Sequence, residues 1–227
     1  MKKLSIALAI ASLGFAGMAQ AYPTLQVTGI LGSATAASDE APPTYPDNIP
    51  AGTNGYVGYL HLLDPSVPVG TLEPVTFTLG GHGDAAFNNL FKVFATQADL
   101  ATQTNPLFTW SSATTPIGTM ETVMLPVSSL LPFKFIANST GSSPYPIDVP
   151  NDGSGNSLNA PNFGLFSTDG LAATQSNSYW IGLSDRVGET PDYQDMTLTA
   201  TVPEPASLAL VGLGLVGLGW SRKRRVK

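Results

Sequence analysis

Four acidic residues follow one another at short spacing near the end of the acidic part of the sequence: Asp185, Glu189, Asp192 and Asp195. Carboxylate oxygens on a short loop suit Ca²⁺, which needs six to eight oxygen ligands at about 2.4 Å. The alternative is a solvated loop in which Arg186, the only cation nearby, pairs with one of the acids. The sequence therefore indicates either a calcium site or an ion-paired loop, and both interpretations stay open.

Other residue types that carry chemistry are scarce. The sequence has no cysteine, only two histidines (His61 and His82) and no Gly-x-Ser-x-Gly motif. A thiolate zinc site and a cysteine nucleophile are therefore excluded, and a hydrolytic triad would lack an organised nucleophile. Residues 152–156 alternate oxygen-bearing side chains like the first half of an EF-hand, but Phe163 stands where the closing Glu belongs, which favours a turn. We expect no enzymatic activity.

Charge is distributed unevenly along the chain. Residues 22–202 contain fifteen acidic residues and three cations, giving a net charge of −12, whereas the whole chain carries −6. All other cations lie at the two ends, at Lys2, Lys3 and residues 222–227. The acidic part has no positive surface to meet phosphates, so a nucleic-acid partner is excluded.

The N-terminal residues have the three parts of a secretory signal peptide. Lys2 and Lys3 precede an apolar run over residues 4–18, and a small-x-small triplet follows with Ala19 and Ala21 at its small positions. The run is short for a bilayer core of about 30 Å, which disfavours a permanent anchor. We expect the Sec translocon to export the chain and signal peptidase to remove residues 1–21.

The C-terminal residues combine a proline motif, an apolar run and a basic tail. Pro203, Glu204 and Pro205 precede an uncharged run over residues 206–220, and the tail spans residues 222–227. A helix over that run would measure about 22 Å, a marginal membrane span that snorkelling arginines and Trp220 would extend. The basic tail would keep the acidic part away from the cytoplasm. The sequence thus predicts a short transmembrane helix that anchors the chain transiently.

This order of motif, span and tail over residues 203–227 resembles the PEP-CTERM sorting signal of Gram-negative bacteria that make extracellular polysaccharide. The resemblance implies recognition by an exosortase, a membrane-embedded cysteine transpeptidase that cuts at or near the Pro-Glu-Pro element. It implies a precursor anchored in the inner membrane and a product at the cell surface or in the extracellular matrix. Physically, the Pro-x-Pro segment keeps the chain extended and forbids a helix at the cleavage strand.

Residues 22–202 are expected to form one all-β ectodomain. Prolines are too dense for long helices, with residues 95–102 as the best helical window, and short runs rich in Val, Thr, Phe and Tyr lie between them. We expect a two-sheet antiparallel β-sandwich of jelly-roll type, with long surface loops at residues 32–54 and 138–161. The candidate strands are residues 24–30, 55–63, 75–79, 90–95, 107–110, 119–125, 133–137, 163–167, 179–183 and 196–201.

A second resemblance covers residues 75–200. Its segments, ending in Asp192-Tyr193-Gln194-Asp195, are similar in order to the β-sandwich ectodomains common among PEP-CTERM proteins and to the DUF4114-type domain, whose last strands flank an acidic D-x-D-Y-N-D-like loop. The chain departs from that motif at Pro191, where an acid is frequent, and at Gln194, where Asn is frequent.

These features predict an exported protein of the cell surface or the exopolysaccharide matrix of a biofilm, with a structural or adhesive role. The alternative is a secreted carbohydrate-binding or carbohydrate-active protein, for which Tyr45 and Tyr145 are the aromatic side chains in predicted loops that could stack on sugars. Extracellular polysaccharide is the expected partner in both cases, and calcium is the candidate cofactor.

Overall fold

The computed structural model describes residues 22–36, 49–82, 87–141, 144–159, 161–169, 172–187 and 190–203. These residues form a nearly all-β structure with a single short helix among them, α2 (Gln97–Thr102). The strands are β1 (Thr24–Thr35), β2 (Asn54–Leu63), β3 (Leu72–Gly81), β4 (Leu90–Val93), β5 (Phe108–Ser111), β6 (Met120–Pro126), β7 (Ser129–Leu130), β8 (Phe133–Ala137), β9 (Ile147–Pro150), β10 (Asn162–Ser167), β11 (Gln175–Ser176), β12 (Ser178–Ser184) and β13 (Met196–Thr201).

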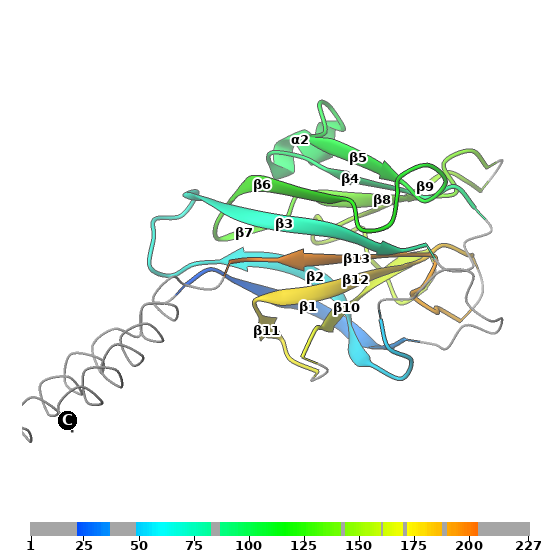
Figure 1. Cartoon of the computed structure of the whole chain (residues 1–227), viewed down its shortest axis with the longest axis horizontal. Coiled ribbons are helices and arrows are strands. Elements are labelled where there is room, and N and C mark those ends of the chain that lie inside the picture. The colour runs from blue at the N-terminus through cyan, green and yellow to red at the C-terminus, as the bar shows by residue number, and fades with distance from the viewer. Residues whose placement is uncertain are drawn as a thin grey trace, which may run out of the picture.

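The strands build two antiparallel sheets that form the two layers of the molecule (Figure 1). The larger sheet has the order β11-β1-β2-β10-β12-β13-β3-β6, with β7 paired to β2. The smaller sheet has the order β5-β4-β8-β9. The predicted all-β fold with two antiparallel sheets is therefore confirmed.

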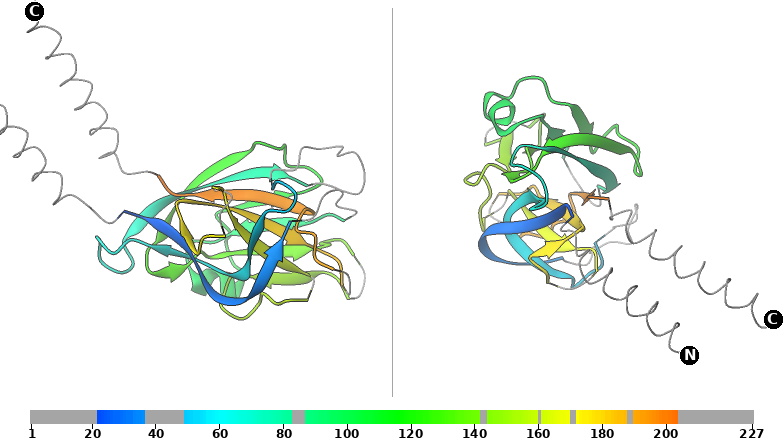
Figure 2. Two further views of the ribbon diagram at one scale, coloured as in Figure 1. Left: turned by 90° about the horizontal axis from the view of Figure 1, so that it is seen from below. Right: turned by 90° about the vertical axis from the view of Figure 1, so that its left-hand side faces the viewer.

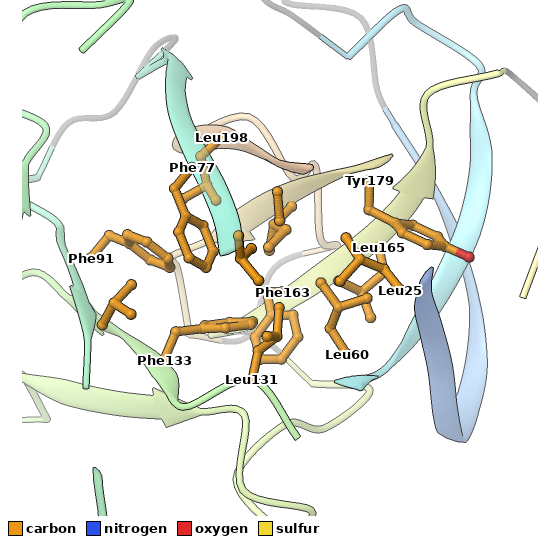
Figure 3. Close-up of a cluster of buried hydrophobic side chains, with 14 of the residues drawn as sticks. Leu25, Leu60, Phe77, Phe91, Leu131, Phe133, Phe163, Leu165, Tyr179 and Leu198 are labelled. Carbon is orange, nitrogen blue, oxygen red and sulfur yellow. The ribbon is translucent and has the colours of Figure 1, made fainter. Parts of the chain in front are cut away.

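The main hydrophobic core fills the space between the sheets. In β3, Val75, Phe77 and Leu79 are fully buried while Thr76 and Thr78 between them are partly exposed, because successive side chains of a strand point to opposite faces. Figure 3 shows aromatic side chains of both sheets meeting in this layer. The Phe91 ring of the smaller sheet, for example, lies 5.6 Å from the Phe77 ring of the larger one, centroid to centroid. The aromatic and aliphatic runs of the sequence thus become the contact between the layers.

A second, smaller core covers part of the outer face of the larger sheet. It consists of Ala34, Ala36, Ile49, Val57, Phe166 and Tyr193, with Trp180 packed at its margin. The Phe166 and Tyr193 rings meet edge to face at 5.5 Å. Burial on both faces explains why every residue of β10 is buried, which the alternation of the other strands would not predict.

Both chain ends of the sandwich lie at the same end of the larger sheet (Figure 2). Thr24 pairs with Leu63 at the end of β2, and Thr201 pairs with Ser178 at the start of β12. The intervening β11 joins them, because Leu25 pairs with Ser176 and the Val202 amide donates to the Asn177 carbonyl at 2.9 Å. We call this end, formed by residues 22–24, 64–72 and 201–203, the exit pole.

The predicted surface loop over residues 138–161 is corrected by the structure. It contains β9, which pairs with β8, and its residues Val149, Asn151 and Asn156 are buried. The polar composition of this segment predicted a surface loop. In the structure, however, its buried Asn side chains form hydrogen bonds with backbone groups of the core. The other predicted loop, residues 32–54, begins inside β1 and ends at the first residue of β2, and residues 37–48 lie outside the described part.

Within the described ranges, no helix is long and apolar enough to cross a membrane. The predicted signal peptide, including Ala19 and Ala21, and the predicted span over residues 206–220 lie outside these ranges. They stay predictions of the sequence.

Candidate functional site

The loop between β12 and β13, residues 185–195, is closed at its base by hydrogen bonds between its two ends. We call it the acidic loop. The Asp185 amide donates to Oδ2 of Asp195 at 2.7 Å, and the Asp195 amide donates to the Leu183 carbonyl at 3.1 Å. Asp185 and Asp195 are both buried. Because Leu183 pairs with Met196, the loop lies at the opposite end of β12 from the exit pole.

The Asp185 carboxylate connects this loop to the smaller sheet. Its Oδ2 accepts a hydrogen bond from Asn89 Nδ2 at 2.5 Å, and Asn89 precedes β4 directly. Asn89 is itself fixed, because its amide donates to Ser112 Oγ and its Oδ1 accepts from the Asn138 amide, both at 2.9 Å. The second carboxylate oxygen, Asp185 Oδ1, is buried and has no hydrogen-bond partner. The carboxylate is therefore held in place but only half satisfied.

Burial raises the pKa of the Asp185 carboxyl because an ionised carboxylate is poorly solvated there. The hydrogen bond from Asn89 lowers the pKa in part, and the negative charge of Asp192 raises it further. The Arg186 cation and a side-chain hydrogen bond with Asp195 lower it again. A buried carboxylate with a raised pKa and one free oxygen can take up a proton or face a cation.

The structure brings together some of the residues predicted for calcium. Asp185 and Asp195 meet at the base of the acidic loop, and Asp192 is near enough for its charge to act on Asp185. Glu189 lies outside the described residues. Among the described residues, no three His, Cys, Asp or Glu side chains are arranged to hold a metal ion. Asp195 is occupied by the Asp185 amide, so part of this acidic cluster serves the loop itself.

The sequence did not predict the contacts that two residues, Asn89 and Tyr145, make with the acidic loop. Asn89 stands 96 positions before Asp185, and no local pattern connects them. Tyr145 was predicted as an exposed sugar contact, but its ring packs against Phe87 and it is half-buried. Its hydroxyl donates to the Asp185 carbonyl and accepts from the Val187 amide, both at 3.2 Å. Tyr145 thus braces the acidic loop, while Tyr45 lies outside the described residues.

The segment with half an EF-hand pattern, residues 151–156, forms a turn. Oδ1 of Asp152 accepts from the Ser154 amide at 2.8 Å and from the Gly155 amide at 2.7 Å. This is the local side-chain-to-backbone bonding typical of an Asx turn. The flanking Asn151 and Asn156 point into the core and bond its backbone.

The predicted sorting motif begins where the sandwich ends. Val202 is buried at the end of β13, and Pro203 is exposed. Glu204 and Pro205 lie outside the described residues.

Comparison with protein families identifies this C-terminal signal: the PEP-CTERM protein-sorting motif matches residues 201–225. No curated protein and no solved structure matches the chain. The match includes only the last residues of the sandwich, Thr201 and Val202, so the likeness of the sandwich to DUF4114-type domains stays a prediction. The chain is therefore an exported protein of the kind that exosortase processes in Gram-negative bacteria, and it carries their PEP-CTERM signal at residues 201–225.

Proposed function

We propose that the β-sandwich is a non-enzymatic display domain with a structural or adhesive role at the cell surface or in the exopolysaccharide matrix. The position of the chain ends carries this proposal. Since Tyr22 and Pro203 lie at one pole, a chain tethered through its sorting signal holds the acidic loop away from the anchor. The acidic loop lies about 20 Å from the exit pole along the seven residues of β12.

Two measurements test this role. Intact mass of the native extracellular protein should give a chain that starts at Tyr22 and ends near residues 202–205, because signal peptidase and exosortase would each have cut once. Deletion of the gene segment for residues 49–202 with both signals retained should then weaken the cohesion of the matrix or the adhesion of the cells. A full-length C-terminus, or unchanged cohesion and adhesion, would contradict the proposal.

Calcium stays part of the proposal as a stabiliser of the acidic loop. It is supported by the buried, unpartnered Asp185 Oδ1 and by the nearby charge of Asp192. Calorimetric titration of the purified chain with CaCl₂ should give binding that Asp192→Asn abolishes and that Asp152→Asn, an acid of the other polar loop, leaves intact. Asp195 is unsuitable for this test because its carboxylate also closes the loop. Equal heats from the two variants would contradict calcium binding here.

A second candidate, carbohydrate binding, is favoured by the outer face of β12, β13, β3 and β6. Cross-strand pairing places two rows of side chains there, Trp180-Thr199-Thr78-Met120 and Ser178-Thr201-Thr76-Thr122. Neither row contains a charge, although the domain is strongly acidic, and hydroxyls beside an aromatic ring suit a neutral glycan. Thr78→Glu should then abolish retention by matrix polysaccharide, whereas Thr109→Glu on the smaller sheet should not. Equal retention would contradict this alternative, and release of cleaved sugar would indicate an enzyme.

A further inference from the structure

The exit pole presents apolar side chains to solvent. Val69, at the tip of the β2–β3 loop, is 80% exposed, and Leu72 at the start of β3 is 54% exposed. Tyr22 and Met124 are 44% and 51% exposed. Tyr22 lies two residues before Thr24, the partner of Leu63, and Met124 pairs with Pro74. Three of the large exposed apolar side chains, Tyr22, Val69 and Leu72, thus belong to the pole where the chain leaves the sandwich, and Met124 lies next to it on β6.

The tip of this pole is also free of charge. Residues 65–72 contain no charged side chain in a domain of net charge −12. Asp64, at the base of the loop, is buried, and its Oδ1 accepts hydrogen bonds from the amide and hydroxyl of Ser66. The anionic surface that would be repelled by acidic lipids is therefore interrupted here.

Backbone hydrogen bonds fix the conformation of the β2–β3 loop. The Gly70 amide donates to the Val127 carbonyl at 3.2 Å, and the Val127 amide donates to the Thr71 carbonyl at 2.8 Å. The Thr71 amide in turn donates to the Pro68 carbonyl at 3.1 Å. Exposure of Val69 is therefore built into the fold, and its docking on another surface would cost little ordering entropy.

The length of chain beyond Pro203 limits what this pole can face. Three residue steps separate Pro203 from Ala206, the start of the uncharged run, and three extended residues span about 10 Å at most. The polar layer on each side of the hydrocarbon core is about 5 to 8 Å thick. If residues 206–220 span the membrane, Pro203 can therefore lie at most about 2 to 5 Å beyond this layer.

We propose that the exit pole is a lipid-docking surface, on which the tethered precursor rests with Val69, Leu72 and Tyr22 in the interfacial layer of the membrane. This inference rests on the proposed membrane tether. Docking would fix the orientation of the sandwich and keep the Pro-Glu-Pro element at the membrane surface, where a membrane-embedded exosortase can reach it. The proline motif alone keeps the chain locally extended, whereas the docked pole determines the distance between the Pro-Glu-Pro element and the membrane.

The natural absence of cysteine allows a direct test. Val69→Cys and Val187→Cys, each labelled with an environment-sensitive fluorophore, place a probe at the exit pole and on the acidic loop, where Val187 is 50% exposed. The labelled precursor, purified from bacterial membranes, is reconstituted into vesicles of phosphatidylethanolamine and phosphatidylglycerol that carry a spin-labelled lipid. We expect quenching of the Val69→Cys probe to be several-fold stronger than quenching of the Val187→Cys probe.

The possible failures are distinguishable. A precursor that does not float with the vesicles would contradict the membrane tether and the docking together. A precursor that floats but shows equal, weak quenching at both positions would contradict the docking alone. Val69 fluorescence that responds to the protein-to-lipid ratio but not to the spin-labelled lipid would indicate that a second copy covers the pole, and would also overturn the inference.

Discussion

The two polar loops of the sandwich, residues 151–156 and the acidic loop, differ in how their buried polar atoms are bonded. Asn151 donates to the carbonyls of Leu60 and Leu131 and accepts from the Leu60 amide, each at 2.8 Å. Asn156 donates to the carbonyls of Gly58 and Phe163 and accepts from the Phe163 amide. In the acidic loop, Asp185 is equally buried but keeps one oxygen without a partner.

This difference separates a structural role from a candidate functional role in the two polar loops. A buried side-chain amide whose donors and acceptor are all hydrogen-bonded requires no ligand. Its hydrogen bonds take the place of strand pairing at the end of the core. A buried carboxylate oxygen without a hydrogen-bond partner raises the free energy of the folded state, and binding of a proton or a cation can offset this cost. The loop over residues 151–156 is therefore expected to determine stability under all conditions, and the acidic loop to respond to solution conditions.

The largest expected effect is the loss of the Asn151 amide. Asn151→Ala would leave the Leu60 amide buried without its partner, while the carbonyls of Leu60 and Leu131 would keep the amides of Leu131 and Phe133 as donors. One unsatisfied buried amide costs about 1 to 3 kcal/mol and two further hydrogen bonds are lost, so the free energy of unfolding should fall by about 2 kcal/mol or more. Chemical denaturation measures this change. Asn159→Ala, at an exposed position three residues after this loop, should change the free energy of unfolding by about 0.5 kcal/mol or less. Similar losses in the two variants would contradict the comparison.

Most of the strands could be predicted from the sequence because apolar and polar residues alternate along them. The Val75–Leu79 run and the Met196–Thr201 run have this pattern, and both are strands whose burial alternates, except that Thr197 in β13 is also buried. Strands β7, β9 and β11 were missed, because each has two to four residues and depends on pairing with distant segments. Such short segments lack a pattern of their own, so tertiary contacts decide their structure.

The candidate site was predictable only along its own loop. The spacing of Asp185, Asp192 and Asp195 indicated an acidic cluster, and the structure places the first and last at the base of one loop. Their burial and the partnership of Asp185 with Asn89 arise from the stacking of two sheets, which no single stretch of sequence encodes. The unpartnered oxygen is likewise a property of the assembled fold.

A smaller effect, dependent on pH, is expected at Asp185. Its raised pKa means that the folded state binds the proton more tightly than the unfolded state, so its contribution to stability is complete below the unfolded pKa and is lost as pH rises through the folded pKa. In calcium-free buffer, Asp185→Asn should therefore raise the free energy of unfolding at pH 7 by about 1 kcal/mol relative to the natural chain. The difference should disappear near pH 3.

Denaturant unfolding at both pH values measures this dependence. Asp152→Asn, an Asp-to-Asn change at an exposed turn, is the matched control. If Asp185→Asn were less stable than the natural chain by the same amount at both pH values, the Asp185 carboxylate would be a structural bond like the Asn151 amide, and the two loops would not differ.

The smallest expected effect concerns Asp152, the acid that gave residues 151–156 their likeness to half an EF-hand. Asp152→Ala would remove the bonds to the amides of Ser154 and Gly155, which costs about 0.5 kcal/mol because the turn is exposed. Because Asn151 and Asn156 keep the loop on the core, the loss should be the same with calcium and with a chelator, as thermal unfolding would show. If the alanine variant instead lost a calcium-dependent rise in Tm that Asp192→Asn retained, then the ion would bind the loop whose amides are already satisfied. The unpartnered Asp185 oxygen would then be only a cost of closing the acidic loop.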